Sequence, residues 1–116
     1  MIEQLTGSHD NVLGFSVSGD VTKEDYDVLT PAVAAEAEKG SVRLLLDMTD
    51  FHWEKVNAWG ADLHFGHEFH DVIDRMALVG DHTWEKHLAQ LAQPFYAQEA
   101  RFFTARDDAW AWVDGD

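Results

Sequence analysis

The sequence predicts an α/β fold, in which a mixed, mainly parallel β-sheet is flanked by α-helices. The strongest signal comes from residues 42–48 (VRLLLDM) and 75–81 (RMALVGD), which are apolar without alternation. Such runs are typical of central strands that are covered on both faces. Segments with helical spacing lie between and after these strands, and that alternation implies right-handed crossovers with parallel pairing. We therefore expect a single domain over residues 1–116 with the order β-β-α-β-α-β-α-β-α.

The N-terminal region predicts a β-hairpin. In residues 12–19 (VLGFSVSG), Leu13, Phe15 and Val17 alternate with glycine or serine, which is the period of a strand with one buried face. The preceding segment IEQL is the expected partner strand, and the sequence GSHDN between them is the expected turn. This hairpin would add an antiparallel edge to the parallel sheet.

The segment after the hairpin changes to a helical period. Its apolar face is formed by Tyr26, Leu29, Val33 and Ala37. Thr22 is the expected N-cap, with Asp25 three residues further on, and Gly40 is the expected stop. Because Pro31 has no amide hydrogen to donate, we expect a short first turn and a fresh helix start at Thr30 and Pro31.

Three further elements are expected in the last third of the chain. Thr83 can cap a helix over WEKHLAQLA, which Pro94 ends. Residues 99–103 (EARFF) are the last strand candidate. Residues 107–113 (DDAWAWV) predict a short final helix, because the two aspartates lie favourably at its N-terminal end.

The composition excludes several classes of function. The chain has 22 acidic and 8 basic residues, a formal net charge of -14, and no cluster of basic residues, so nucleic acid is not an expected partner. It has no cysteine, no signal-peptide pattern and no apolar run long enough for a membrane helix, so we expect a cytoplasmic protein without membrane insertion. It also has no glycine-rich phosphate-binding motif, and we expect no cofactor.

The segment ADLHFGHEFHDV, residues 61–72, is rich in histidine and comes within one residue of the zinc motif H-E-x-x-H. On a helix, however, His64, His67 and His70 fan over about 120° of the surface. Three imidazoles so arranged cannot converge on one ion held about 2 Å from each nitrogen. We therefore expect no metal site, with His70 half-buried among apolar side chains and the other two histidines in solvent.

The same helical projection reveals a second apolar stripe, in which Phe65 and Phe69 lie nearly opposite the first apolar face. Three interpretations remain open: a surface for a partner, the wall of a ligand pocket, or a segment that packs back on the sheet. The candidate residues for contact with a partner or an apolar ligand are Trp53, Trp59, Phe65, Phe69 and the neighbouring His70.

A polar cluster follows the first central strand. Asp47 ends that strand, and Thr49 and Asp50 come directly after it. Ligands of open α/β sheets bind beyond the carboxyl ends of the strands, which makes this cluster a candidate site. The alternative is that Asp47 caps the turn that follows it.

The segments TKEDYDVLTPAV, RLLLDM, ADLHFG and DRMALVGDHTWEKHL, with the closing RFF and AWAWV, resemble the SpoIIAA-like group of small bacterial proteins. This group is related to STAS domains and is described alongside SEC14-type lipid-binding modules. The likeness extends over nearly the whole chain, and ALVGDHTWEKHL is its most specific part. The resemblance implies a STAS-like fold and no enzymatic activity.

Members of the sporulation branch of this group are switched by phosphorylation of a serine at the start of the helix after the third strand. The corresponding place here is residues 57–60 (NAWG), which have no hydroxyl group. Thr49, further upstream, is a weak substitute. The sequence therefore does not predict this phospho-switch.

These observations favour a non-enzymatic, STAS-like regulatory or protein-interaction module that forms a homodimer. Its interface would come from Trp53, Trp59, Phe65 and Phe69. The alternative is a SEC14-like carrier or sensor of a small apolar ligand, lined by the same aromatic segment. A metal-dependent hydrolase is the third and least favoured reading.

Overall fold

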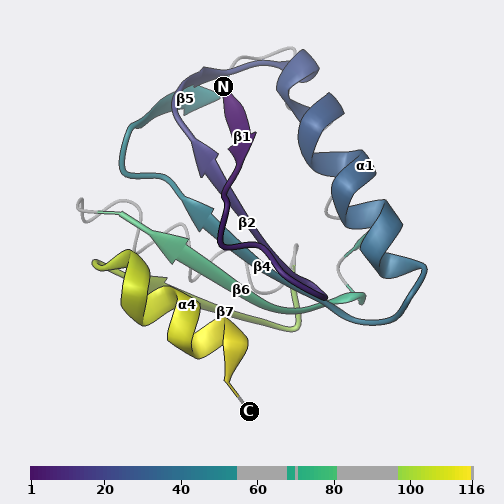
Figure 1. Ribbon diagram of the computed structural model, residues 1–116. Helices are drawn as coiled ribbons and strands as arrows, with labels where there is room; N and C mark the ends of the chain where they lie inside the picture. The colour runs from purple at the N-terminus through teal and green to yellow at the C-terminus, as the bar shows by residue number, and fades with distance from the viewer. Residues whose placement is uncertain (55–67, 70, 81–96, 116) are drawn as a thin grey trace.

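The computed structural model describes residues 1–54, 68–69, 71–80 and 97–115, with residues 51–54 described by their backbone alone. Its main sheet has the strand order β1-β2-β4-β6-β7 (Figure 1). Strand β1 is antiparallel to β2, and the other pairs are parallel, as the sequence predicts. The strands of this sheet are β1 Ile2–Gln4, β2 Val12–Val17, β4 Val42–Asp47, β6 Ile73–Val79 and β7 Glu99–Phe103.

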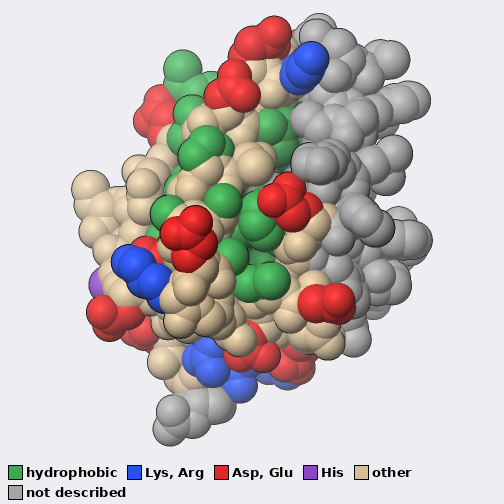
Figure 2. All heavy atoms as spheres, turned by 90° about the vertical axis from the view of Figure 1, so that its right-hand side faces the viewer, with side chains coloured by type: hydrophobic (Ala, Val, Ile, Leu, Met, Phe, Trp, Pro, Cys, Tyr) green, Lys and Arg blue, Asp and Glu red, His purple; other side chains and the backbone are tan. Residues whose placement is uncertain are grey.

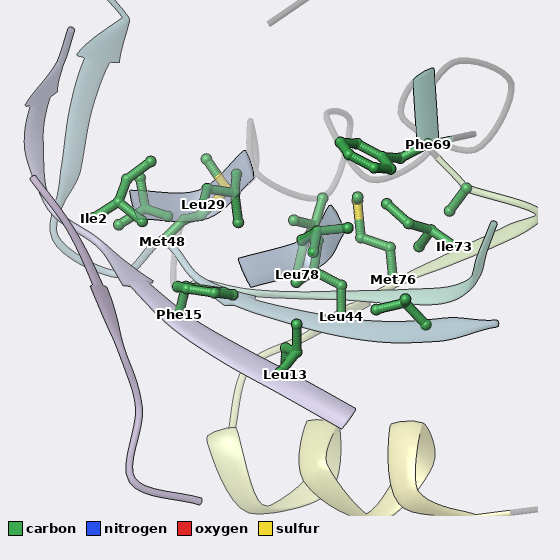
Figure 3. Close-up of a cluster of buried hydrophobic side chains, with 14 of the residues drawn as sticks. Ile2, Leu13, Phe15, Leu29, Leu44, Met48, Phe69, Ile73, Met76 and Leu78 are labelled. Atoms are coloured by element: carbon green, nitrogen blue, oxygen red, sulfur yellow. The ribbon is translucent and has the colours of Figure 1, made fainter. Parts of the chain in front are cut away.

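Among the described residues, helix α1 packs on one face of the sheet and helix α4 on the other. Helix α1, Tyr26–Ala37, buries Leu29 and Val33 in the larger core cluster, and helix α4, Arg106–Asp114, buries Ala109 and Val113 in the smaller one. Figure 3 shows the larger cluster on the side of the sheet away from α4. Among the described helices, none combines the length and the apolar composition needed to cross a bilayer.

The central strands are buried on both faces, which confirms the interpretation of their unbroken apolar runs. In β4 the neighbours Leu44 and Leu45 are both fully buried, and each belongs to a different core cluster. Successive side chains of a strand point to opposite faces. An apolar run without alternation is therefore what a strand between two covering layers requires.

Strand β2 departs from the prediction of a single buried face. Leu13 and Phe15 lie in the larger cluster as expected, but Val12 and Gly14 are buried too. Trp110 of α4 rests directly on Gly14, where an added Cβ would lie 2.4 Å from the Cη2 atom of the indole. The glycine therefore marks the close approach of a second layer, which alternation alone does not reveal.

The start predicted at Thr22 belongs to a 3-10 turn that leads directly into helix α1, and the helix is not interrupted. The carboxylate of Asp25 accepts hydrogen bonds from the backbone N–H of Thr22 at 2.7 Å and from its hydroxyl at 3.2 Å, across the 3-10 turn η1, Lys23–Asp25. Pro31 lies inside one continuous helix, so the predicted restart is wrong. The fixed φ of proline suits a helix, and packing of Leu29 and Val33 on the sheet offsets the lost hydrogen bond and the crowding of the proline ring against the preceding turn. Gly40 follows the helix end with a φ of 142°, a conformation that favours glycine.

A second, two-stranded parallel sheet joins β3, Gly19–Val21, to β5, Phe51–Glu54. The sequence did not predict it, because three or four residues are too short to show a period. The backbone N–H of Gly19 donates to the carbonyl of Asp50 at 2.8 Å. This small sheet therefore ties the segment after β4 to the segment after β2. The helices expected before β6 and after Thr83 lie mostly or wholly outside the described residues.

Candidate functional site at the carboxyl edge of the sheet

The four parallel strands end side by side at one edge of the sheet. Asp47, the last residue of β4, pairs in register with Ser16 on β2 and with Val79 on β6, and Val79 pairs with Phe103 on β7. Helix α4 begins three residues after Phe103, so its first turn lies at this same edge. The edge therefore brings together segments that are far apart in the sequence.

Asp47 is the centre of a closed hydrogen-bond network and is 8% exposed. Its Oδ1 atom accepts from the backbone N–H of Thr49 at 3.0 Å and from the Thr49 hydroxyl at 2.6 Å. Its Oδ2 atom accepts from the Nε and Nη2 atoms of Arg106 at 2.9 and 2.6 Å. Each carboxylate oxygen thus has two donors.

The electrostatics of this network favour the ionised carboxylate. Burial acts to raise the pKa of the Asp47 carboxyl, but the hydrogen bonds from Thr49, followed by those from Arg106 and its positive charge, outweigh burial and hold that pKa below its usual 3.8. An ionised carboxylate has no proton to donate. With its acceptor positions used by Thr49 and Arg106, Asp47 caps the turn after β4, which is the alternative that the sequence left open.

The structure brings together only part of the predicted polar cluster. Asp47 and Thr49 are bonded to each other, whereas Asp50 is exposed and contributes its backbone carbonyl to Gly19. The residue that sequence reasoning missed is Arg106. Only the strand topology could have indicated Arg106, because in a parallel sheet the residues that follow β7 lie at the same edge as those that follow β4.

The aromatic candidates are only partly covered by the described residues. Phe69 is 3% exposed and packs in the larger core cluster with Ile73 and Met76 (Figure 3). Of the three interpretations of this segment, packing back on the sheet is the one that the buried position of Phe69 fits.

Trp53 lies in β5, where only the backbone is described, and Trp59, Phe65 and His70 lie outside the described residues. His64 and His67 lie outside them as well, so the roles expected for these residues stay predictions. Within the described ranges, no three His, Cys, Asp or Glu side chains are grouped in a way that could hold a metal ion.

Two arginines that the sequence did not single out hold the other end of α4. Arg43 on β4 donates to the carbonyl of Val113 at 3.0 Å, and Arg75 on β6 donates to the carbonyl of Trp112 at 2.7 Å. Both also donate to the carbonyl of Gly115. Cations are favourable at a helix C-terminus, where unpaired carbonyls and the helix dipole attract them. Helix α4 is therefore fixed at both ends, by Arg106 at its start and by Arg43 and Arg75 at its end.

Comparison with known proteins agrees with this architecture. The SpoIIAA-like family model matches residues 12–114. The crystal structure of an uncharacterised protein of the DUF3478 family with a SpoIIAA-like fold, from Shewanella loihica PV-4, superposes with a TM-score of 0.81 at 25% sequence identity, covering 97% of this chain and 92% of that chain. No curated protein matches the chain. The sheet order, the covering helices α1 and α4 and the family match lead to one conclusion: the chain belongs to the SpoIIAA-like family.

Proposed function

We propose that the protein is a non-enzymatic, STAS-like regulatory module that acts by binding protein, including a second copy of itself. The observation that carries this proposal is the closed network around Asp47. At the carboxyl edge, where open α/β sheets present reactive groups to ligands, the buried carboxylate is held ionised by Thr49 and Arg106. These hydrogen bonds fix the turn after β4 and the start of α4, so the role of Asp47 that we propose is structural. In this proposal, protein binding takes place on the outer surfaces of the domain.

Self-association is the first binding event that we propose. Trp53, Trp59 and Phe65 supply large apolar area in one segment of the chain, and tryptophan is enriched among the residues that dominate the energy of interfaces. The proposal places the protein in the cytoplasm, where a chain without cysteine meets no redox constraint. Its net charge of -14 disfavours nucleic acid as a partner.

Light scattering coupled to size exclusion tests the homodimer. We expect wild type to elute as a dimer and the Trp59→Ala and Phe65→Ala variants to shift towards monomer, while Ala111→Ser, on the exposed side of α4, stays dimeric. Circular dichroism on each variant separates lost association from lost folding. A wild-type protein that stays monomeric at the highest concentration reached would contradict self-association. A stoichiometric added mass in native mass spectrometry would instead favour the carrier of an apolar ligand.

A further inference from the structure

The tight turn between β1 and β2 places a histidine beside the end of helix α4. His9 and Val12 exchange backbone hydrogen bonds of 2.9 and 2.8 Å, so they close a two-residue turn made of Asp10 and Asn11. The side chain of Asn11 also donates to the carbonyl of Ser41 at 2.8 Å, which ties the turn to the start of β4. The backbone of His9 is therefore held in place, and its side chain reaches α4 from a fixed position.

Both ring nitrogens of His9 face an acceptor. Nδ1 lies 2.8 Å from the carbonyl oxygen of Gly7, and Nε2 lies 2.6 Å from Oδ1 of Asp114, the last residue of α4. A carbonyl oxygen has no proton to donate, and neither has an ionised carboxylate. Each contact is therefore a hydrogen bond only if the ring nitrogen donates. A neutral imidazole has one N–H group, so the arrangement in which both contacts are made belongs to the imidazolium, which has two.

The charges that face His9 favour the imidazolium as well. The hydrogen bonds to the Gly7 carbonyl and to the Asp114 carboxylate, followed by the negative charges of Asp114 and Asp10, outweigh desolvation and raise the pKa of His9 above 6.5. The side chains of His9 and Asp114 are 46% and 49% exposed, so water reaches the contact. In Figure 2 histidine (purple) is visible at the edge of the described surface, with acidic side chains (red) next to it. The ring can therefore change its charge without unfolding of the domain.

The last turn of α4 contains no basic residue, and the cations that hold it come from other elements. Arg43 and Arg75 donate to carbonyl groups of this turn at 3.0 and 2.7 Å. Asp74 offsets part of their charge, since its carboxylate lies 3.3 Å from the Nε of Arg43. A guanidinium keeps its charge at every physiological pH, whereas an imidazole loses its charge near neutral pH. Among the described cations at this helix end, His9 is therefore the one that titrates.

We propose that His9 is a pH-sensitive latch, whose imidazolium ties the turn between β1 and β2 to the last turn of α4 and whose neutral form releases that tie. Loss of one ring proton leaves a lone pair facing either the Gly7 carbonyl or the Asp114 carboxylate, so at least one of the two contacts is lost. The latch is closed at low pH and opens as the pH rises through the folded-state pKa of His9. A response to pH goes beyond the proposed function, and it involves residues other than the aromatic segment.

Opening of the latch acts locally, because the other contacts at this end of α4 do not titrate near neutral pH. Trp110 packs on Gly7, where an added Cβ would lie 3.0 Å from the Cζ2 atom of the indole. Arg43 and Arg75 stay charged and keep their hydrogen bonds to the helix end. The open form therefore stays folded and loses order in residues 111–115.

The test is an NMR titration of the isotopically labelled full chain between about pH 5.5 and about pH 8.5. Ring nitrogen shifts give the number of protons on the His9 imidazole. Backbone carbon shifts of residues 111–115 report helix content without interference from amide exchange. We expect these carbon shifts to move towards random-coil values with the midpoint of the His9 titration. By linkage, an increase of about 1 in the pKa of His9 over its value in Asp114→Asn corresponds to about tenfold tighter closure of the protonated form.

Three variants make the assignment specific. His9→Gln removes the titrating group but keeps a side-chain N–H, so it should leave the carbon shifts of residues 111–115 independent of pH. Asp114→Asn keeps the shape of the acceptor and removes its charge, so it should lower the His9 midpoint and shrink the step. His52→Gln is the matched control, because it removes a histidine from β5, which follows the carboxyl end of β4 and lies far from the end of α4; the step should be unchanged.

Two results would overturn the inference: a step at residues 111–115 that persists in His9→Gln, or carbon shifts that stay constant there while His9 titrates in the wild-type chain. Self-association is measured by light scattering and does not involve these residues, so failure of the latch would leave the proposed function in place.

Discussion

Replacement of Asp47 by asparagine probes the network at the carboxyl edge with almost no change in shape. The amide oxygen can still accept from the backbone and hydroxyl of Thr49. The amide nitrogen, however, would face Arg106, where the carboxylate now accepts two hydrogen bonds at 2.9 and 2.6 Å. The substitution therefore removes the ion pair and leaves the turn contacts in place.

The size of the effect follows from the burial of the two partners. The Asp47 side chain is 10% exposed and the Arg106 side chain 49% exposed, so water can solvate the arginine once the carboxylate is gone. Loss of one partner of a fully buried pair costs about 3–5 kcal/mol, and a fully exposed pair contributes less than about 1 kcal/mol. For this half-buried pair we expect Asp47→Asn to lower the free energy of unfolding by about 1–2 kcal/mol at neutral pH.

The effect also has a defined dependence on pH. The folded-state pKa of Asp47 lies below its usual 3.8, so its ionised form stabilises the fold above the unfolded-state pKa. That stabilisation is lost as the pH falls through the folded-state pKa. Urea denaturation of wild type and variant should show the full difference at pH 7 and a smaller one in strong acid.

A double-mutant cycle with Arg106→Gln isolates the pair. If the two substitutions act through the same ion pair, the double variant should be no less stable than the worse single variant. Asp47→Asn with wild-type stability at pH 7, or strictly additive effects of the two substitutions, would refute the reasoning.

Three further predictions concern other parts of the fold. Gly14→Ala forces a Cβ to within 2.4 Å of Trp110, so thermal or urea denaturation should show a loss of about 1–3 kcal/mol, which Trp110→Leu should largely relieve; a neutral Gly14→Ala would contradict the packing. Pro31→Ala restores a backbone donor inside α1, and denaturation should show a gain of about 1–3 kcal/mol; a loss would argue for the predicted helix break. The hydrogen bonds of His9 to the Gly7 carbonyl and the Asp114 carboxylate raise the pKa of its imidazole from 6.5, so an NMR titration should give a higher value that Asp114→Asn lowers. The contribution of these bonds to the stability of the fold is complete below the unfolded-state pKa and is lost as the pH rises through the folded-state pKa.

The strands show why part of this fold is readable in the sequence. Three consecutive leucines, as in residues 44–46 of β4, put apolar side chains on both faces of a strand, and a central strand between two layers covers both faces. Position within the sheet then places Asp47 at the carboxyl edge. The alternation in β2 is less informative, because Gly14 has no side chain to indicate that Trp110 covers it.

The ion pair at the site lies beyond what sequence patterns can provide. Asp47 and Arg106 are 59 residues apart; Asp47 ends β4, whereas Arg106 begins α4 after β7, and β6 lies between these two strands. The strand order determines which ends are close, and short-range periodicity does not encode that order. The uninterrupted helix at Pro31 has a similar cause, since packing of Leu29 and Val33 on the sheet outweighs one missing backbone bond.

The arginines of this chain share one structural role, which is to hold helix α4 on the sheet. The chain has four arginines, and every one of them contacts α4 or belongs to it: Arg43, Arg75, Arg101 and Arg106. Arg75 and Arg101 also place their guanidinium groups 5.3 and 5.0 Å from the ring centre of Trp112. The arginines are thus concentrated around α4, on one side of the sheet. Arg75→Gln should therefore lower the free energy of unfolding in urea denaturation, because it removes the hydrogen bond to the Trp112 carbonyl and the contact with the Trp112 ring; a variant as stable as wild type would contradict this role.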